Sequence, residues 1–353
     1  MTIPELLIDK DFDYLFYLEE YPDIKNYDKY NTSISLEQKL FRHYVNHGKS
    51  EGRLPKKQED IAIPDINNQN QIDISQLGFY TNKLECIAIL VTEQEVVAGL
   101  LDSLFIKIRN STLSKETRGI SFKVVINNIT NQDNQIDTSI LNTLFTDIEV
   151  INLQLSVEED LYIRDQNKIP EIAPTYGTKS GPNVMFYRTL EMCKTYNTTL
   201  LLETDCFLKS LWLSKLRNFI DTSNGFWISG ATYDGVVPFK ADSEMSTHIN
   251  GGIALYATGN KTFQKFMSQS EIFLIERIKS GLTGLAYDVN IKTYIDYLIK
   301  NYTDTTENIL VSKFILRQYL PNKIIGNFSS PADSGTSLEQ IQTLYNYYII
   351  HKK

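Results

Sequence analysis

Short apolar runs alternate with longer amphipathic stretches through the middle of this chain, and this alternation constrains the fold more than any other feature. Residues 84–91 (LECIAILV) are almost continuously apolar, as expected for a strand buried on both faces. Residues 94–108 repeat apolar side chains at helical spacing, and residues 121–126 and 148–153 are again strand-like. A repeated strand–helix–strand order predicts an α/β fold with a mainly parallel sheet.

Strand-like and helix-like stretches continue through the rest of the chain. Strands are expected at residues 199–202, 226–229 and 253–256, and helices at 140–145, 182–196, 209–220, 261–278, 286–300 and 337–349.

Charge, hydropathy and cysteine content exclude several classes of protein. Lys and Arg number 35 against 43 Asp and Glu, a net charge of −8, which disfavours general nucleic-acid binding. No apolar run approaches the roughly 18 residues that would span a bilayer, so no transmembrane segment is expected. Each of the three cysteines lies in an apolar run, and we expect reduced, buried thiols in a cytoplasmic protein: Cys86, Cys193 and Cys206.

The strongest chemical signal is a pair of carboxylates that ends an apolar strand. Glu203 and Asp205 follow residues 199–202 and, at a spacing of two, point the same way from an extended backbone. Ligands bind at the carboxyl ends of strands in open α/β sheets, and paired carboxylates there suit Mn²⁺ or Mg²⁺. The alternative is that both residues cap the helix that follows, because acidic side chains favour helix N-termini.

This motif and its surroundings resemble the nucleotide-sugar glycosyltransferases of the GT-A fold over residues 81–330. In that fold an apolar strand ends in Asp-X-Asp or Glu-X-Asp, which here reads Glu203-Thr204-Asp205. The resemblance implies a divalent cation held by Glu203 and Asp205 against the diphosphate of a UDP or GDP sugar.

The resemblance also assigns the remaining donor contacts. The ends of the first two strands hold the nucleobase and ribose in the family, and a glycine-containing loop leads into the helix before the acidic motif. The implied nucleotide-sugar residues are Thr92, Glu93, Asn127, Lys179, Gly181, Asn183, Arg188 and Thr204. Asn127 departs from the acidic residue that is common in the family, and Phe186-Tyr187-Arg188 stands where many relatives have Ala-Arg-Asn.

Acceptor and catalytic roles follow from the downstream sequence. A Gly-Gly pair before a strand resembles the acceptor loop of the family, and inverting relatives have Glu-Asp where this chain has Tyr287-Asp288. The resemblance therefore implies Asp288 as the base of an inverting transfer to a glycan or protein hydroxyl. Acceptor contacts are expected from Trp227, Tyr233, His248, Asn250, Gly251 and Gly252. Core packing is the commoner fate of a Trp.

Residues 1–57 differ from the rest and are expected to form a small helical module. Aromatic side chains recur at helical spacing before Pro22, and residues 35–47 carry a second apolar face. The pattern resembles a module found beside glycosyltransferases of bacteria and large DNA viruses, which suits partner binding and implies the host cytoplasm for a viral protein. Residues 58–80 are polar and are expected to link it to a GT-A domain at 81–353.

Three other functions compete with this interpretation. A catalytically inactive protein that binds carbohydrate or nucleotide sugar is consistent with the departures at Asn127 and Tyr287. A sugar nucleotidyltransferase would need a Gly-rich stretch with a basic residue after the first strand, and residues 92–98 (TEQEVVA) have neither. A two-carboxylate hydrolase is disfavoured because Glu203 and Asp205 share one strand face and cannot flank a bond.

Overall fold

The computed structural model describes residues 13–26, 35–44, 80–131, 136–163, 174–235, 247–301, 313–328, 337–344 and 346–352. These residues form an α/β fold around a seven-stranded sheet with the order β3-β2-β1-β4-β7-β6-β8. The strands are β1 (Leu84–Val91), β2 (Ser121–Ile126), β3 (Ile148–Asn152), β4 (Thr198–Leu202), β6 (Ile228–Gly230), β7 (Ala254–Tyr256) and β8 (Tyr319–Pro321).

The sheet is mainly parallel, as predicted. β3, β2, β1 and β4 run parallel, whereas β7 is antiparallel to both β4 and β6. β1 lies between β2 and β4, so the strand order reverses direction beside β1. Such a reversal opens a crevice at the carboxyl ends of the strands, where open α/β sheets bind their ligands.

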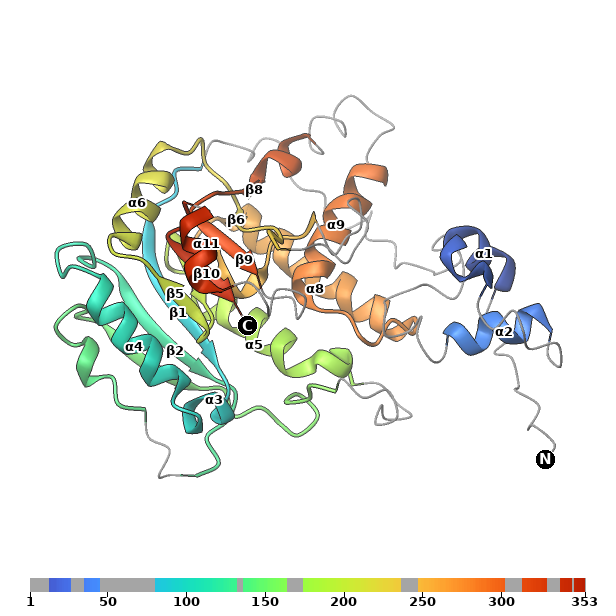
Figure 1. The fold of residues 1–353 in the computed structure, drawn as a ribbon, viewed down its shortest axis with the longest axis horizontal. Helices are drawn as coiled ribbons and strands as arrows, with labels where there is room; N and C mark the ends of the chain where they lie inside the picture. The colour runs from blue at the N-terminus through green and yellow to red at the C-terminus, as the bar shows by residue number, and fades with distance from the viewer. Residues whose placement is uncertain are drawn as a thin grey trace.

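Helices cover both faces of this sheet (Figure 1). Side chains of β1 alternate between two cores: Ile87 and Ile89 join one apolar cluster, and Cys86 and Ala88 join the other. The first cluster includes side chains of α4 (Leu100–Ser111) and α6 (Trp212–Thr222). The second includes side chains of α5 (Ser180–Met192), α8 (Lys261–Lys279) and α9 (Tyr287–Asn301). Burial on both faces explains the continuous apolar run of β1.

Two predicted helices differ in the structure. The helix expected at residues 94–108 is split into α3 (Glu93–Val97) and α4, because Gly99 between them has φ +72°, a left-handed conformation that favours glycine. The helix expected at 140–145 is only a 3₁₀ turn, Ser139–Leu141.

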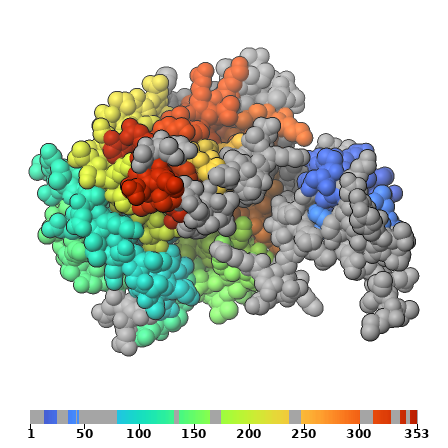
Figure 2. All heavy atoms as spheres, in the orientation of Figure 1, coloured from blue at the N-terminus to red at the C-terminus, as the bar shows by residue number. Residues whose placement is uncertain are grey.

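The C-terminal prediction is wrong in a way that matters for the site. The helix expected to reach Ile349 ends earlier, as α11 (Leu338–Leu344), and the chain then forms β10 (Ile349–Lys352). β10 lies between β5 (Cys206–Leu208) and β9 (Ile325–Phe328) in a second, three-stranded sheet. In Figure 2 the red atoms of the C-terminal residues lie between the yellow atoms around α6 and the teal atoms around α4.

The predicted N-terminal helices are present as α1 (Tyr14–Glu20) and α2 (Leu36–His43). They pack through a small aromatic cluster in which the Tyr17 hydroxyl lies 3.0 Å from His43 Nδ1. Residues 58–79 of the expected linker lie outside the described residues. Within the described part of the chain, no helix is both long and apolar enough to cross a bilayer.

Candidate active site

The predicted carboxylates lie at the carboxyl end of β4, next to the reversal in strand order. β4 ends at Leu202 and β5 begins at Cys206, so Glu203 and Asp205 occupy the short link between the two sheets. The side chain of Glu203 is 31% exposed and that of Asp205 is 27% exposed. Both carboxylates are therefore partly open to solvent at an edge of the sheet where ligands bind.

His351 on β10 completes this group. Its Nε2 lies 2.7 Å from Glu203 Oε2 and 3.0 Å from Asp205 Oδ1, although 146 residues separate it from Asp205. Register explains the approach, because β10 pairs with β5 so that His351 stands opposite Cys206, the residue after Asp205. Burial alone would lower the pKa of His351, but the two carboxylates outweigh it and raise that pKa from 6.5 to about 9.

The donor set fits a divalent cation. One ligand atom from each of Glu203, Asp205 and His351 lies within 4.8 Å of the others. Carboxylate oxygens suit Mg²⁺ and Mn²⁺ alike, whereas an imidazole nitrogen favours Mn²⁺, a transition metal, over Mg²⁺. Among the described residues this is the one group of three or more histidine, cysteine, aspartate or glutamate side chains that could hold a metal ion.

The loop before β7 packs against the Glu203–Asp205–His351 group. Because β7 runs antiparallel to β4, the start of β7 lies beside the end of β4. A methyl group on Gly252 would collide with the Glu203 side chain, 2.8 Å from its Cγ and closer to its carboxylate. Asn250 accepts a hydrogen bond from the Gly252 amide through Oδ1, and its Nδ2 lies 3.0 Å from His351 Nδ1. The Asn250 side chain thus contacts the imidazole on the side opposite the two carboxylates.

Asp288, the predicted base, lies on the other side of this loop. It is in the first turn of α9, and the Gly251 amide lies 3.4 Å from its Oδ2. His248 Nε2 is 3.6 Å from the same oxygen. Burial raises the pKa of Tyr256, and the nearby carboxylates of Asp288 and Glu203 raise it further. The structure therefore brings together Asp288, Gly251, Gly252 and the Glu203–Asp205–His351 group.

The strand-end residues predicted to bind nucleotide are joined by hydrogen bonds. Thr92 caps α3 and bonds with Glu95, whose Oε1 accepts a 2.6 Å hydrogen bond from the Thr204 hydroxyl. The Glu93 amide donates to Asn127 Oδ1 at 3.0 Å. These contacts connect the ends of β4, β1 and β2 in one polar network along the carboxyl edge of the sheet.

The residues predicted at the start of α5 lie in different environments. Lys179 is half-buried and no described carboxylate pairs with it, and Gly181 donates its amide to Leu161. Asn183 is fully buried and bonds with the backbone of Tyr176, Leu285 and Tyr287, which is a structural role.

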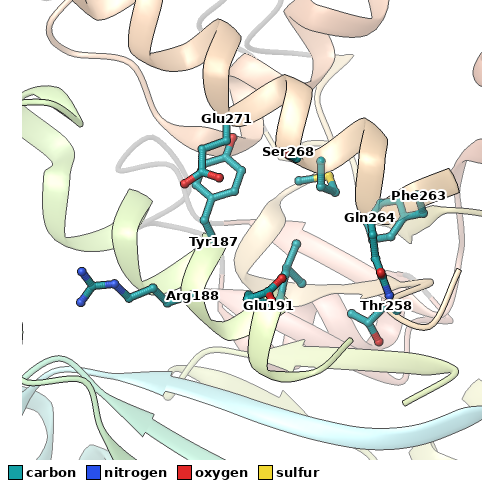
Figure 3. Close-up of a pocket in the computed structure, with 10 residues that line it drawn as sticks. Tyr187, Arg188, Glu191, Thr258, Phe263, Gln264, Ser268 and Glu271 are labelled. Carbon is teal, nitrogen blue, oxygen red and sulfur yellow. Dashed lines mark hydrogen bonds between the residues drawn. The ribbon is translucent and has the colours of Figure 1, made fainter. Parts of the chain in front are cut away.

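Arg188 lies farther along α5 and pairs with Glu159. It also lines a cavity of about 300 Å³ between α5 and α8, together with Glu191, Gln264 and Glu271 (Figure 3). Glu203, Asp205 and His351 do not line this cavity.

Two predicted acceptor residues are used elsewhere in the structure. Trp227 is 2% exposed and packs against Phe266 and Phe314 in the core, so its ring presents no face to a sugar. Tyr233 forms a single β-bridge with Asn327.

His351 is the residue of the candidate site that sequence reasoning missed. It stands alone in Ile349-Ile350-His351-Lys352, and no neighbouring motif marks it as a ligand. The apolar residues Ile349 and Ile350 before it are the one local signal. They predict a strand if the helix expected at residues 337–349 ends before them.

No known protein family and no curated protein matches the chain by sequence. Solved structures of several glycosyltransferases resemble it. The galactosyltransferase LgtC, in complex with donor and acceptor sugar analogues, is 14% identical, with 76% of this chain and 86% of that chain covered and a TM-score of 0.40. Mouse xyloside xylosyltransferase 1 is 12% identical, with 76% and 97% covered and a TM-score of 0.39. Glycosyltransferase GlyE of Streptococcus pneumoniae is 12% identical, with 76% and 54% covered and a TM-score of 0.38.

Proposed function

We propose that this protein is a metal-dependent glycosyltransferase that moves a sugar from a UDP or GDP sugar to a hydroxyl of a glycan or protein. The observation that carries the proposal is the Glu203–Asp205–His351 group at the carboxyl end of β4, beside the reversal in strand order. Carboxylate and imidazole ligands with room for substrate oxygens suit a cation that binds a diphosphate.

Glu203, Asp205 and His351 would hold Mn²⁺ or Mg²⁺. When bound, the cation supplies positive charge that neutralises the departing nucleoside diphosphate. Lys179 at the start of α5 is a second candidate for contact with the phosphates.

Asp288 would take the proton of the acceptor hydroxyl in an inverting transfer. The acceptor oxygen bonds to the anomeric carbon while the bond from that carbon to the diphosphate oxygen breaks, and the hydroxyl proton passes to the Asp288 carboxylate. Support comes from the position of Asp288 across Gly251 and Gly252 from Glu203. His248, beside the same carboxylate, is placed to orient it or to contact the acceptor.

The domain organisation belongs to the same proposal, with residues 81–353 as the transferase and residues 1–57 as a separable partner-binding module. A truncated chain that begins at Thr81 is expected to stay monodisperse and to bind nucleotide. Aggregation of the truncated chain would instead make the module part of the core.

The test of the metal assignment is Asp205→Asn, measured as Mn²⁺-dependent hydrolysis or transfer across a panel of nucleotide sugars. Loss of one oxygen ligand should abolish turnover and weaken Mn²⁺ binding without unfolding the protein. Asp221→Asn, an exposed carboxylate on α6, is the matched control and should behave as the parent. Equal activity of Asp205→Asn and parent at every Mn²⁺ concentration would rule out the assignment. Nucleotide-sugar binding without any turnover would favour the inactive binding protein.

A further inference from the structure

The cavity between α5 and α8 is separate from the Glu203–Asp205–His351 group and shares no residue with it. Side chains of α5 form one wall and side chains of α8 form the other (Figure 3). Its volume of about 300 Å³ is at the small end of the range for small-molecule sites. A compact ligand therefore fits this cavity better than a segment of another protein.

Part of the cavity lining is apolar. Leu190 of α5 and Phe263 and Met267 of α8 line it, and each is at most 7% exposed. All three belong to the second apolar cluster, so packing fixes these side chains in place. The cavity therefore offers a preformed surface for the hydrocarbon part of a ligand.

Three charged side chains line the cavity, and two of them are already paired. Arg188 pairs with Glu159, and in Figure 3 its guanidinium points away from the other labelled side chains. Glu191 pairs with Lys194, and both side chains are exposed. An exposed pair of this kind contributes little to stability, so Glu191 can accept a competing cation.

Glu271 is the lining residue whose charge is not matched. It is half-buried on α8, and its Oε1 accepts a 2.5 Å hydrogen bond from the Tyr176 hydroxyl. Burial and the Glu271 carboxylate raise the pKa of Tyr176, so this hydroxyl keeps its proton and donates. Within the described ranges no lysine, arginine or histidine forms an ion pair with Glu271. One hydroxyl fills one of about four acceptor positions on a carboxylate, which leaves room for a cation.

An aromatic side chain lies beside this carboxylate. Tyr187 lines the same cavity, and Figure 3 shows its ring against the Glu271 side chain. Aromatic rings attract ammonium groups through the negative charge on their faces. The surroundings of Glu271 therefore suit an organic ammonium group.

We propose that this cavity binds a linear aliphatic amine, with a protonated amine at Glu271 and the hydrocarbon chain against Leu190 and Met267. Such amines are charged at neutral pH, as the pKa of about 10.4 for lysine illustrates. A second amine on the same chain can meet Glu191 on the opposite wall. An anionic ligand is excluded, because the one cation that lines the cavity is held by Glu159. The inference does not depend on the proposed function.

The experiment uses the methyl group of Met267 as a local reporter. The full chain, labelled with ¹³C at its methionine methyl groups, is titrated with 1,5-diaminopentane in EDTA and followed by NMR, and Met267→Leu identifies the signal. We expect a saturable shift of this signal with a dissociation constant of about 1 mM, which is within reach of a ligand this small. 1,5-Pentanediol has the same chain without the charges and should bind at least about 10-fold more weakly.

Two variants and one control test the site. Glu271→Gln keeps an acceptor for the Tyr176 hydroxyl but removes the charge, and it should weaken diamine binding by about 10-fold. Glu276→Gln removes the same charge from α8 outside the cavity lining and should bind as the parent does. Ser268→Phe fills the cavity from an exposed position and should abolish the shift, which keeps the test open if Glu271→Gln fails to fold.

Three results would each overturn the proposal. The first is a Met267 signal that does not move during the titration, and the second is equal binding of the diamine and the diol. The third is a folded Glu271→Gln protein that binds the diamine as tightly as the parent. Diamine bound only at the Glu203–Asp205–His351 group would give this third result, because that group shares no residue with the cavity.

Discussion

Replacing Gly252 by alanine should displace one metal ligand while leaving the fold in place. The added methyl group would lie 2.8 Å from Glu203 Cγ, whereas ordinary contacts begin at about 3.4 Å, so Cγ must move by roughly 0.6 Å. The displacement at the carboxylate is larger, because the methyl group would lie closer to it. Metal–ligand distances tolerate about 0.2 Å, so Glu203 cannot keep its place as a ligand.

We expect Mn²⁺ affinity to fall by about 10- to 100-fold, the scale of losing support for a metal ligand. The thermal midpoint without metal should change little, because a partly exposed side chain can move aside. Calorimetric titration with Mn²⁺ and thermal melts in EDTA measure the two effects separately. Gly119→Ala is the control: φ there is +75°, so the variant strains the backbone, but its methyl group meets nothing within 4 Å. A folded Gly252→Ala protein that binds Mn²⁺ as tightly as the parent would refute the reasoning.

Three further outcomes follow from the structure. The pKa of His351 is raised from 6.5 to about 9, so its stabilising contribution is present below pH 6.5 and is lost as pH rises through 9. The free energy of unfolding in EDTA should therefore fall by about 3 kcal/mol over this range, and His351→Gln should remove most of that slope in chemical denaturation. Asp288→Asn should lower transfer by about 10²- to 10⁴-fold with unchanged UDP and GDP binding, and unchanged transfer in stopped assays would exclude it as the base. Trp212→Ala should cost about 3–5 kcal/mol in urea melts, because Trp212 is fully buried and its indole donates to Thr112, and a cost below 1 kcal/mol would contradict this packing.

Sequence reasoning succeeded where a local pattern carries the whole physical signal. The continuous apolar run of β1 and the acidic end of β4 were readable because burial and strand period act over a few neighbouring residues. Helix α9 and the position of Asp288 in its first turn were readable for the same reason.

The missed features depend on contacts between distant segments. His351 becomes part of the site through pairing of β10 with β5, and no local periodicity reports that pairing. Asn127 matched a nucleotide-binding position by its place after β2, yet its amide is used to hold Asp160. Trp227 was predicted to contact the acceptor because it is aromatic, but its ring packs in the core. Core packing is the commoner fate of a tryptophan, so residue type alone does not predict a sugar contact.

The location of His351 on β10 also determines when the proposed metal site is complete. Glu203 and Asp205 lie in the link after β4, and the third ligand comes 146 residues after Asp205. A growing chain that has formed β1, β2 and β4 holds two carboxylates and gains the imidazole only after β10 pairs with β5. A bound ion then acts as a cross-link between the two sheets, and its binding energy adds to the stability of the folded state. Metal depletion should therefore loosen the small sheet before the large one, with hydrogen exchange rising first in β10.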